Sequence, residues 1–334
     1  MVLLASALIA VAGHEVMLHS RRLARARGSI QTSDFSLSFF NSVNIRNSKT
    51  LATIEEIKLC NSYYNRLINN SIKGCVDGVL LANNEVNVIF LWNPTLRKIV
   101  DIPLDNSLKK TEDVTFGFGF DSVSNIYKVV ALSFKKSGLK TMVYNLGSRS
   151  WTPPKVKSCS IKNVKYLSST PRFVNFQGCV YWLAKAGITR NNKQTHYLCF
   201  NLSTEALTCS KVPDVKCVDG INYVSWRRLA VLHESLALVV DYSGDTNSHD
   251  RHIRVWIRPK DSTTSVFSWV ELYNLDCGGK SFIYLTNSGN LYLQSWPLPK
   301  TLSVCDLKTG KEKVCSERYI NFMDGYLESL ALLR

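Results

Sequence analysis

Few residues of this sequence have the types and spacing that catalysis or metal binding requires. The ten cysteines include no Cys-x-x-Cys pair, which zinc and thioredoxin-type sites use. We expect His249 and His252 to lie in a polar loop over residues 249–252, which offers too few further ligands for a metal site. No serine lies in a Gly-x-Ser-x-Gly elbow, and no pair of carboxylates stands out. The sequence therefore predicts a protein that is not an enzyme and has no metal or cofactor.

Gly117 and Gly119 alternate with aromatic residues in a short run that could suggest a nucleotide-binding loop. Such a loop needs a third glycine and a following helix, and the sequence has neither here. We expect these glycines to lie in a strand, where a missing side chain lets another part of the protein approach the backbone closely.

The positive charge of the chain is concentrated in one window. The chain has 41 Lys and Arg against 26 Asp and Glu, a net charge of +15, yet no Asp or Glu occurs between Ser122 and Thr204. The thirteen positive residues of this window are Lys128, Lys135, Lys136, Lys140, Arg149, Lys155, Lys157, Lys162, Lys165, Arg172, Lys185, Arg190 and Lys193. Such a field raises the encounter rate with acidic partners. We predict that the basic sector formed by residues 128–193 steers a protein partner with an acidic surface.

Trp226, Arg227 and Arg228 combine an aromatic ring with two guanidinium groups, residue types that are enriched in binding hot spots. We expect them, and Trp296, to lie on loops at a rim of the molecule. The candidate partner-binding residues are Lys135, Lys136, Lys140, Lys155, Lys157, Lys162, Lys165, Trp226, Arg227 and Arg228.

A repeated hairpin must position these residues. In its first copy, Leu91–Pro103, a strand ends at a four-residue turn that Asn93 and Pro94 set, and a second strand follows. Five copies align on Trp92, Tyr144, Phe200, Trp256 and Cys305, at spacings of 52, 56, 56 and 49 residues. A period near 50 built from short strands is typical of kelch-like propeller blades.

A second strand–turn–strand unit precedes each copy, for example the one that turns at Asp77-Gly78, a strong tight-turn pair. Each module therefore holds about four strands, which make one blade. We predict an all-β chain with a single propeller of five or six blades over residues 51–334. We expect its last apolar run, 326–333, to pair with the first blade and close the ring. Trp92, Trp151, Trp182 and Trp269 recur at module positions and are expected to pack between blades.

Residues 1–50 show neither the repeat nor a clear domain of their own. We expect a short, partly helical or disordered segment here, with a basic helix over residues 14–27. The apolar run 1–13 is too short to span a bilayer, and no basic residues precede it as in a secretory signal. We therefore expect a cytoplasmic or nuclear protein with reduced cysteines.

An ordered set of motifs resembles a known family. The motifs are WNPTLRK, DIP, FGFDSVSNIYKVV, VYNLGSRSW, FQGCVYWL, VWIRPK, FSWVEL and YLESLAL. Over about residues 70–334 the chain resembles the F-box-associated propeller domain of plant F-box proteins, which include the S-locus F-box proteins of pollen. The resemblance implies a propeller that recruits a protein substrate for ubiquitination. An N-terminal F-box would join it to a Skp-type adaptor and a cullin scaffold in an SCF complex.

The N-terminal segment departs from this pattern. The family's F-box begins with a Leu-Pro pair and contains a Cys-Lys-x-Trp-like element, whereas residues 1–50 contain no Pro, Cys or Trp. We therefore interpret residues 1–50 as a segment with a degenerate or missing F-box. Binding to a Skp-type adaptor and cullin is implied only if an F-box function survives there.

Two other functions stay open. The basic sector interleaves lysines with Phe134, Tyr144, Trp151 and Tyr166, a combination that nucleic-acid-binding proteins use. A secreted propeller lectin or hydrolase is the other possibility; it requires cleavage of the N-terminal run and pairing of some cysteines.

Overall fold

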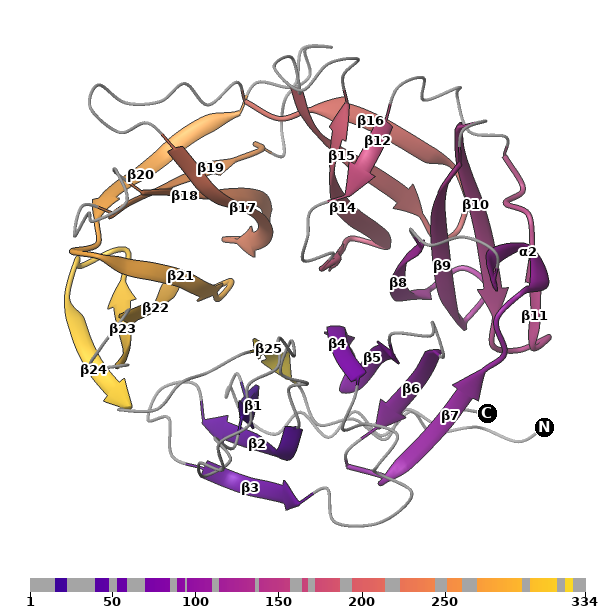
Figure 1. Cartoon of the computed structure of the whole chain (residues 1–334), viewed down its shortest axis with the longest axis horizontal. Helices are drawn as coiled ribbons and strands as arrows, with labels where there is room; N and C mark the ends of the chain where they lie inside the picture. Colours follow the sequence, from indigo (N-terminus) through magenta and orange to yellow (C-terminus); the bar gives the residue numbers. More distant parts are fainter. Residues whose placement is uncertain are drawn as a thin grey trace, which may run out of the picture.

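The computed structural model has six antiparallel β-sheets, which stand around a common axis in the described part of the chain (Figure 1). The structure describes residues 16–22, 40–47, 53–58, 70–84, 89–93, 95–109, 114–135, 138–156, 164–167, 172–186, 194–213, 223–243, 251–259, 269–295, 301–316 and 322–326. This arrangement confirms the all-β propeller, and we call each sheet a blade.

Blade I takes its strands from both ends of the chain, and blades II and III follow it in chain order. Blade I has β1 (Val16–Arg22), β2 (Phe40–Asn47), β3 (Thr53–Lys58) and β25 (Phe322–Tyr326). Blade II has β4 (Asn70–Val76), β5 (Val79–Asn84), β6 (Ile89–Asn93) and β7 (Lys98–Ile102), and the short helix α2 (Asn106–Lys109) follows it. Blade III has β8 (Val114–Asp121), β9 (Ile126–Lys135), β10 (Gly138–Asn145) and β11 (Ser150–Thr152).

The other three blades follow in chain order. Blade IV has β12 (Val164–Leu167), β13 (Val174–Phe176), β14 (Cys179–Ala186), β15 (Gln194–Asn201) and β16 (Leu207–Lys211). Blade V has β17 (Tyr223–Leu232), β18 (Ser235–Ser243), β19 (Arg251–Ile257) and β20 (Val270–Asp276). Blade VI has β21 (Lys280–Leu285), β22 (Asn290–Ser295), β23 (Leu302–Asp306) and β24 (Glu312–Ser316).

The five residues on which the sequence repeats align occupy equivalent places in the blades. Each lies in the third strand of its blade, counted outward from the axis, and each side chain is buried. The five are Trp92 on β6, Tyr144 on β10, Phe200 on β15, Trp256 on β19 and Cys305 on β23. The predicted repeat is therefore confirmed.

In four blades, an Asn or Asp at the last position of the third strand builds the hairpin that follows this strand. The side-chain oxygen of Asn93 accepts a hydrogen bond from the backbone N–H of Leu96 at 3.1 Å. Asn145, Asn201 and Asp306 make the same type of bond, to residues two and three positions on. This confirms the turn predicted at Asn93. In blade V, Ile257 occupies the position, and the connection to β20 is longer.

Each of these turns ends in a residue with a left-handed backbone, four positions after the Asn or Asp. The φ angles are 50° at Arg97, 52° at Arg149, 58° at Glu205 and 68° at Gly310. The inner hairpins of blades II, IV and V use two left-handed residues instead, as at Asp77 (47°) and Gly78 (71°), where a tight turn was predicted. Those of blades III and VI use one, Asn125 and Gly289. Both kinds of turn join neighbouring strands with the twist that a blade requires.

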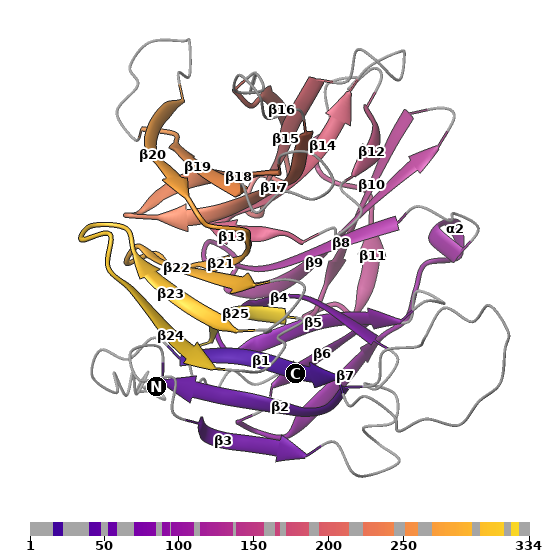
Figure 2. The ribbon, with the colours of Figure 1, turned by 60° about the vertical axis from the view of Figure 1, so that its left-hand side comes forward.

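The ring closes through β25. β4 lies against β8, β8 and β17 against blade IV, β17 against β21, and β21 and β4 against β25. β25 pairs antiparallel with β1, from Val16 opposite Tyr326 to Ser20 opposite Phe322. Figure 2 shows β25 inside this ring from a second direction. Closure by a C-terminal strand is thus confirmed, but the strand is Phe322–Tyr326; residues 327–333 of the expected run lie outside the described residues.

The basic helix expected over residues 14–27 is wrong for Val16–Arg22, which form β1. β1 and β2 come from the predicted N-terminal segment and pair with each other, and β2 pairs with β3. Local sequence did not reveal this strand, because β25, its partner on one side, lies about 300 residues away along the chain.

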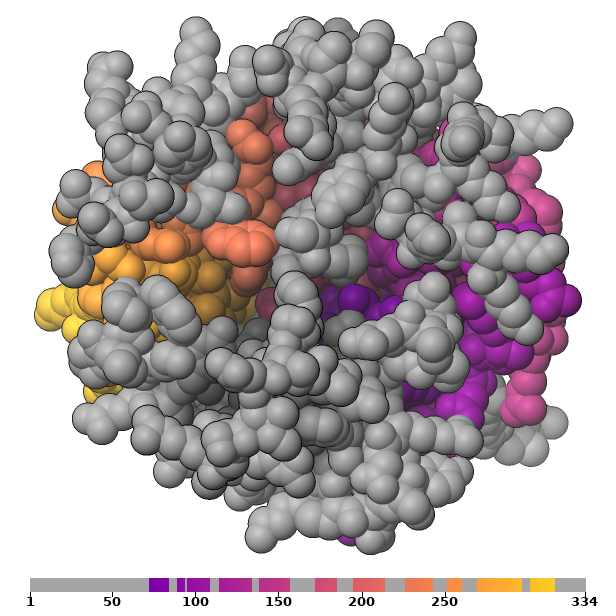
Figure 3. Space-filling view, viewed as in Figure 1, coloured from indigo at the N-terminus to yellow at the C-terminus, as the bar shows by residue number. Residues whose placement is uncertain are grey.

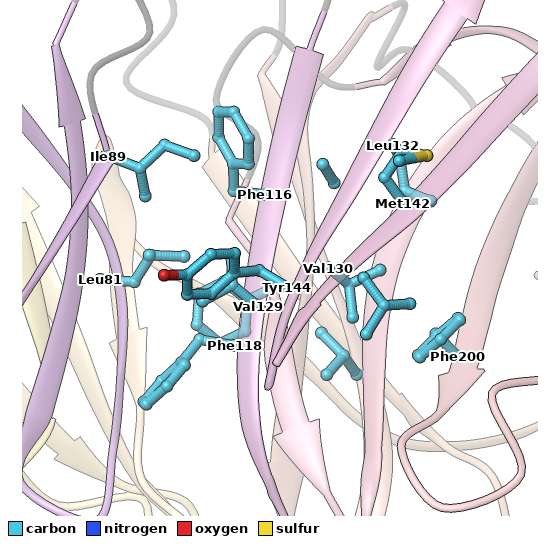
Figure 4. Close-up of a cluster of buried hydrophobic side chains, with 14 of the residues drawn as sticks. Leu81, Ile89, Phe116, Phe118, Val129, Val130, Leu132, Met142, Tyr144 and Phe200 are labelled. Atoms are coloured by element: carbon cyan, nitrogen blue, oxygen red, sulfur yellow. The ribbon is translucent and has the colours of Figure 1, made fainter. Parts of the chain in front are cut away.

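The core lies between the blades and joins blades II, III and IV (Figure 4). Leu81 and Ile89 of blade II, Phe116 and Phe118 of blade III and Phe200 of blade IV belong to one buried cluster. Gly117 is part of this contact: a side chain there would place its Cβ 2.3 Å from the Trp182 ring. The expected role of this glycine, close approach within a strand, is confirmed.

Three of the four repeated tryptophans also join blades, as predicted. Trp182 Nε1 donates a hydrogen bond to the carbonyl of Phe116 at 3.2 Å, from blade IV to blade III. Trp151 Nε1 donates to the carbonyl of Pro103 at 2.6 Å, from blade III to the segment after blade II. Trp269 lies edge-on to Tyr197, with 6.0 Å between ring centroids, and so joins blades V and IV. Trp92 is 1% exposed.

The seven cysteines that the structure describes are all free thiols: Cys75, Cys179, Cys199, Cys209, Cys277, Cys305 and Cys315. Among the described residues, no helix has both the length and the apolar character that crossing a membrane requires.

Candidate partner-binding surface

Asp121 and Glu205 are the carboxylates that flank the window of the sequence without Asp or Glu. Both form ion pairs with one lysine of that window, Lys128. Lys128 Nζ lies 2.9 Å from Asp121 Oδ2 and 2.9 Å from Glu205 Oε1. It also donates a hydrogen bond to the carbonyl of Leu202 at 2.7 Å. An ammonium group has three N–H donors, and here each has an acceptor. Lys128 lies on β9 and Glu205 follows β15, so the cluster joins blade III to blade IV.

This cluster is buried and holds two blades together, so it is not part of a partner-binding surface. Lys128 and Asp121 are each 2% exposed. Burial opposes ionisation of Asp121, but hydrogen bonds from Lys128, Ser124 and Ser203 outweigh it and hold the pKa of this carboxyl below its usual range. The prediction that Lys128 belongs to a steering basic sector is therefore wrong, because its charge is buried and neutralised by two carboxylates.

The described lysines among the candidates lie apart. Lys155 is exposed, and its backbone N–H donates to Glu205 Oε2 at 3.0 Å, beside Lys128. On β10, Asn145 pairs with Lys128, whereas Lys140 pairs with Ser133. Lys140 lies five positions from Asn145 along this strand, or about 17 Å away. Lys140 Nζ donates to Ser107 Oγ beyond blade II.

The other candidate lysines cannot be placed with the same detail. Lys135 ends β9 and Lys165 lies in β12, and the structure describes the backbone at both positions. Lys136, Lys157 and Lys162 lie outside the described residues. Whether these residues bind a partner stays a prediction.

Trp226, Arg227 and Arg228 lie in β17, the innermost strand of blade V, and the prediction of a rim loop is wrong for them. β17 pairs with β18 along its length, with a bulge between Val224 and Trp226. Trp226 is 41% exposed. In Figure 3 the coral to orange atoms of blade V reach the surface of the face shown, beside the middle of the ring. Trp296 lies outside the described residues.

Arg228 is held against blade VI. Its Nη1 donates to the carbonyl of Ile283 at 2.9 Å, and its guanidinium carbon lies 5.4 Å from the centre of the Phe282 ring. Burial, and next the charge of Arg172, lower the pKa of Arg228 to about 9. Arg228 is therefore a half-buried cation near the axis rather than a mobile surface anchor.

Asp241 on β18 forms a buried ion pair within blade V and accepts a hydrogen bond from blade VI. It lies 3.3 Å from Arg251 Nη1 and accepts the backbone N–H of Phe282 in blade VI at 3.2 Å. Burial is the largest effect on this carboxyl and raises its pKa to about 6, against the charges of Arg251 and Arg228. Arg251 and His252 begin β19, so the polar loop expected over residues 249–252 is wrong for these two.

Two further cations near the axis were not singled out from the sequence as candidates. Lys73 lies on β4, and Arg172 lies just before β13. We call Lys73, Arg172 and Arg228 the axial cations. The sequence could have indicated them only through their position, because each lies in or beside the innermost strand of a blade. Within the described residues, no group of three or more His, Cys, Asp and Glu side chains is arranged to hold a metal ion.

A family model for the F-box associated β-propeller domain matches residues 29–332. The chain belongs to this family. The F-box associated propeller is a protein-interaction domain of F-box proteins, and the match covers all six blades except β1. No curated protein matches the sequence.

The fold of this F-box associated propeller is similar to that of a solved structure of unrelated sequence. TolB from Acinetobacter baumannii aligns with a TM-score of 0.52 at 8% identity; the alignment covers 94% of this chain and 66% of that one. A hypothetical selenium-binding protein from Sulfolobus tokodaii aligns with a TM-score of 0.43 at 9% identity, over 91% of this chain and 74% of that one. At such identity, the likeness to TolB concerns the fold alone.

Proposed function

We propose that this F-box associated propeller is the substrate-recruiting half of an F-box-type ubiquitin ligase adaptor. The observation that carries the proposal is the family match over residues 29–332. Blades II to VI are joined by a buried ionic cluster, by tryptophans and by hydrogen bonds, and such contacts would make the ring a rigid platform for surface side chains. A rigid platform lowers the entropy cost of binding a protein partner.

The proposed partner carries an acidic surface, and the protein meets it in the cytoplasm or the nucleus. Lys155 and Arg149 are exposed in blade III, so their charges contribute to the field outside the protein. Because exposed charges act mainly on association rates, this field would speed the encounter more than it would tighten the complex. The exposed ring of Trp226 offers an apolar contact of the kind that anchors interfaces.

Binding of the purified full-length chain to a Skp-type adaptor tests the ligase role. A related propeller with an intact F-box serves as the positive control. Binding by both proteins supports the proposal and indicates that this chain keeps an adaptor-binding function. Binding by the control alone contradicts the ligase role and leaves a propeller that can hold a partner but cannot deliver it for ubiquitination.

A further inference from the structure

Two cysteines of blade IV are neighbours on the paired strands β14 and β15. In the register of these strands, Cys179 lies opposite Asn201. Two positions away, Cys199 lies opposite Tyr181. Because side chains two positions apart share one face of a sheet, the two thiols point to the same face as diagonal neighbours. Both pack against the same buried cluster, which takes in residues of β18 and β19, so the pair lies where blade IV meets blade V.

Hydrogen bonds from β15 converge on the sulfur atom of Cys179. Asn201 Nδ2 donates to Cys179 Sγ at 3.7 Å. The orientation of this amide is fixed, because its oxygen accepts the backbone N–H groups of Ser203 and Thr204. Cys199 also forms a hydrogen bond with Cys179, thiol to thiol. The strand register and these contacts therefore bring the two sulfur atoms together.

The two thiols differ in how readily they ionise. The hydrogen bond from Cys199 is the main reason why the pKa of Cys179 lies below its ordinary value; burial opposes this effect, and the positive charge of Arg258 adds to it. Arg258 follows β19, and its Nη1 donates to Tyr197 Oη at 2.8 Å, which holds it on blade IV. The same thiol–thiol hydrogen bond, with burial, raises the pKa of Cys199, which keeps its proton. The pair therefore combines a nucleophilic thiolate with a neighbouring thiol.

The pair is open to small molecules and close enough to be bridged. Both cysteines are half-buried, and Cys179 begins β14 directly after Gln177 and Gly178, two exposed turn residues. A disulfide needs Cα atoms within about 7 Å of each other, and the usual spacing of diagonal neighbours on paired strands begins at about that distance. A small shift of the strand end beside this turn is therefore enough to join the two sulfur atoms.

We propose that Cys179 and Cys199 form an oxidation site, which hydrogen peroxide converts to a disulfide. The Cys179 thiolate attacks one peroxide oxygen, the O–O bond breaks, and the leaving hydroxide takes up a proton to become water. The sulfur of Cys199 then attacks the resulting sulfenic acid, the S–O bond breaks, and the oxygen leaves as a second water with the proton of Cys199. The two thiols lose two electrons, and two molecules of a small thiol reverse the reaction by exchange. This site goes beyond the proposed ligase role and does not rest on it.

Peptide mapping of the full-length chain after treatment with dilute hydrogen peroxide tests the site. Free thiols are blocked with N-ethylmaleimide, and trypsin then separates the two cysteines into residues 173–185 and 194–211. The second peptide also holds Cys209, so the mapping uses the Cys209→Ser variant. We expect these two peptides to be linked, to separate in dithiothreitol, and to stay unlinked when Cys179→Ser is added. A persistent sulfenic acid at Cys179 without a link, or a link that forms equally fast in the chain unfolded in urea, would overturn the proposal.

Alkylation rates of the reduced protein separate the two roles of Cys199. With iodoacetamide at neutral pH, we expect Cys179 to react at least about tenfold faster than Cys209, a half-buried thiol of the same blade whose pKa is raised by burial. Cys199→Ala removes the hydrogen-bond donor and should slow the alkylation of Cys179. Cys199→Ser keeps a donor, so it should preserve this rate while abolishing the disulfide. An unchanged rate in Cys199→Ala, or equal rates for Cys179 and Cys209, would contradict the assigned roles.

Discussion

At the scale of single residues, Lys128 shows how one side chain can join two blades. Its three donors reach Asp121, Glu205 and the carbonyl of Leu202, and all of these groups are buried or nearly so. We predict that Lys128→Met destabilises the protein by about 3–5 kcal/mol, because two carboxylates are left buried without a compensating charge. Urea unfolding followed by circular dichroism measures this loss.

The control for this change is Lys98→Met, which removes an exposed lysine of β7. Substitutions at such surface positions usually change the free energy of unfolding by less than about 0.5 kcal/mol. If the Lys128 variant loses no more stability than the control, the cluster does not hold blades III and IV together.

Asp241 gives a dependence on pH with the sign opposite to that of most carboxylates. Its pKa is raised from 3.8 to about 6 in the folded protein, so the folded state binds more protons between pH 4 and pH 6. The contribution of this group to stability is present below about pH 4 and is lost as pH rises through 6. Two pKa units correspond to roughly 3 kcal/mol.

Comparison with Asp241→Asn isolates this effect. We predict that the stability of the wild type relative to the variant falls between pH 4 and pH 7, as measured by urea unfolding at each pH. A relative stability that rises over this range would mean that Arg251 outweighs burial and that the pKa of Asp241 is lowered.

The role of a residue could be predicted where its partner is the nearby backbone. It could not be predicted where its partner lies far away along the chain. Asn93 was predicted to build a turn because its own backbone supplies the partner three residues on. The burial of Lys128 was not predicted, because Glu205 lies 77 positions further along the chain. The contact of Gly74 with Phe173 was missed for the same reason, because the two residues belong to blades II and IV.

At the scale of elements, four outer hairpins each have one residue with a left-handed backbone, and in only one of them is this residue a glycine. We predict that Gly310→Ala destabilises the protein by about 1 kcal/mol through its backbone alone, since φ is 68° and an added Cβ meets nothing within 4 Å. The equivalent residue of blade II is Arg97, at 50°. Arg97→Gly should therefore stabilise the protein, by up to about 1 kcal/mol.

Thermal unfolding of the two variants beside the wild type measures both effects. The opposite signs make the test specific, because a general loss of packing would lower the unfolding temperature in both. Equal shifts in the same direction would contradict the view that the fourth position after the Asn or Asp sets the cost of this turn.

The blades were predictable as elements because their hairpins repeat, whereas β1 was not. Asn93, Asn145, Asn201 and Asp306 each end a third strand, and these residue types at a regular spacing are visible in the sequence. The region of β1 reads instead as a basic helix, because Arg21 and Arg22 follow a short apolar run. Only pairing with β2 and β25 makes it a strand.

At the scale of the whole molecule, the number of blades could not be fixed from the repeat. Five blades carry the organising hairpin, but blade I is assembled from β1, β2 and β3 at one end of the chain and β25 at the other. None of these strands carries the motif, so the sequence left five or six blades open. The sixth sheet forms only when the two ends of the chain pair and close the ring.

This construction makes stability depend on a short C-terminal strand. We predict that a chain ending at residue 321, which lacks β25, loses about 3 kcal/mol or more, the size of a strongly destabilising change. β1 would lose all five of its pairings on that side, and β21 and β4 would lose the strand that lies between them. Hydrogen exchange should then show reduced protection in β1, β4 and β21, with less change in blades III and IV.

A chain ending at residue 326 is the matched control, because it keeps β25 and removes only residues 327–334. If closure by β25 is what stabilises the ring, this chain should retain amide protection in β1 and β4, and the two truncations should differ sharply. If both lose protection equally, the stabilising contacts come from the residues after 326. If neither does, the ring is held by the contacts between blades, such as those of Lys128 and Asp241, and does not need its ends joined.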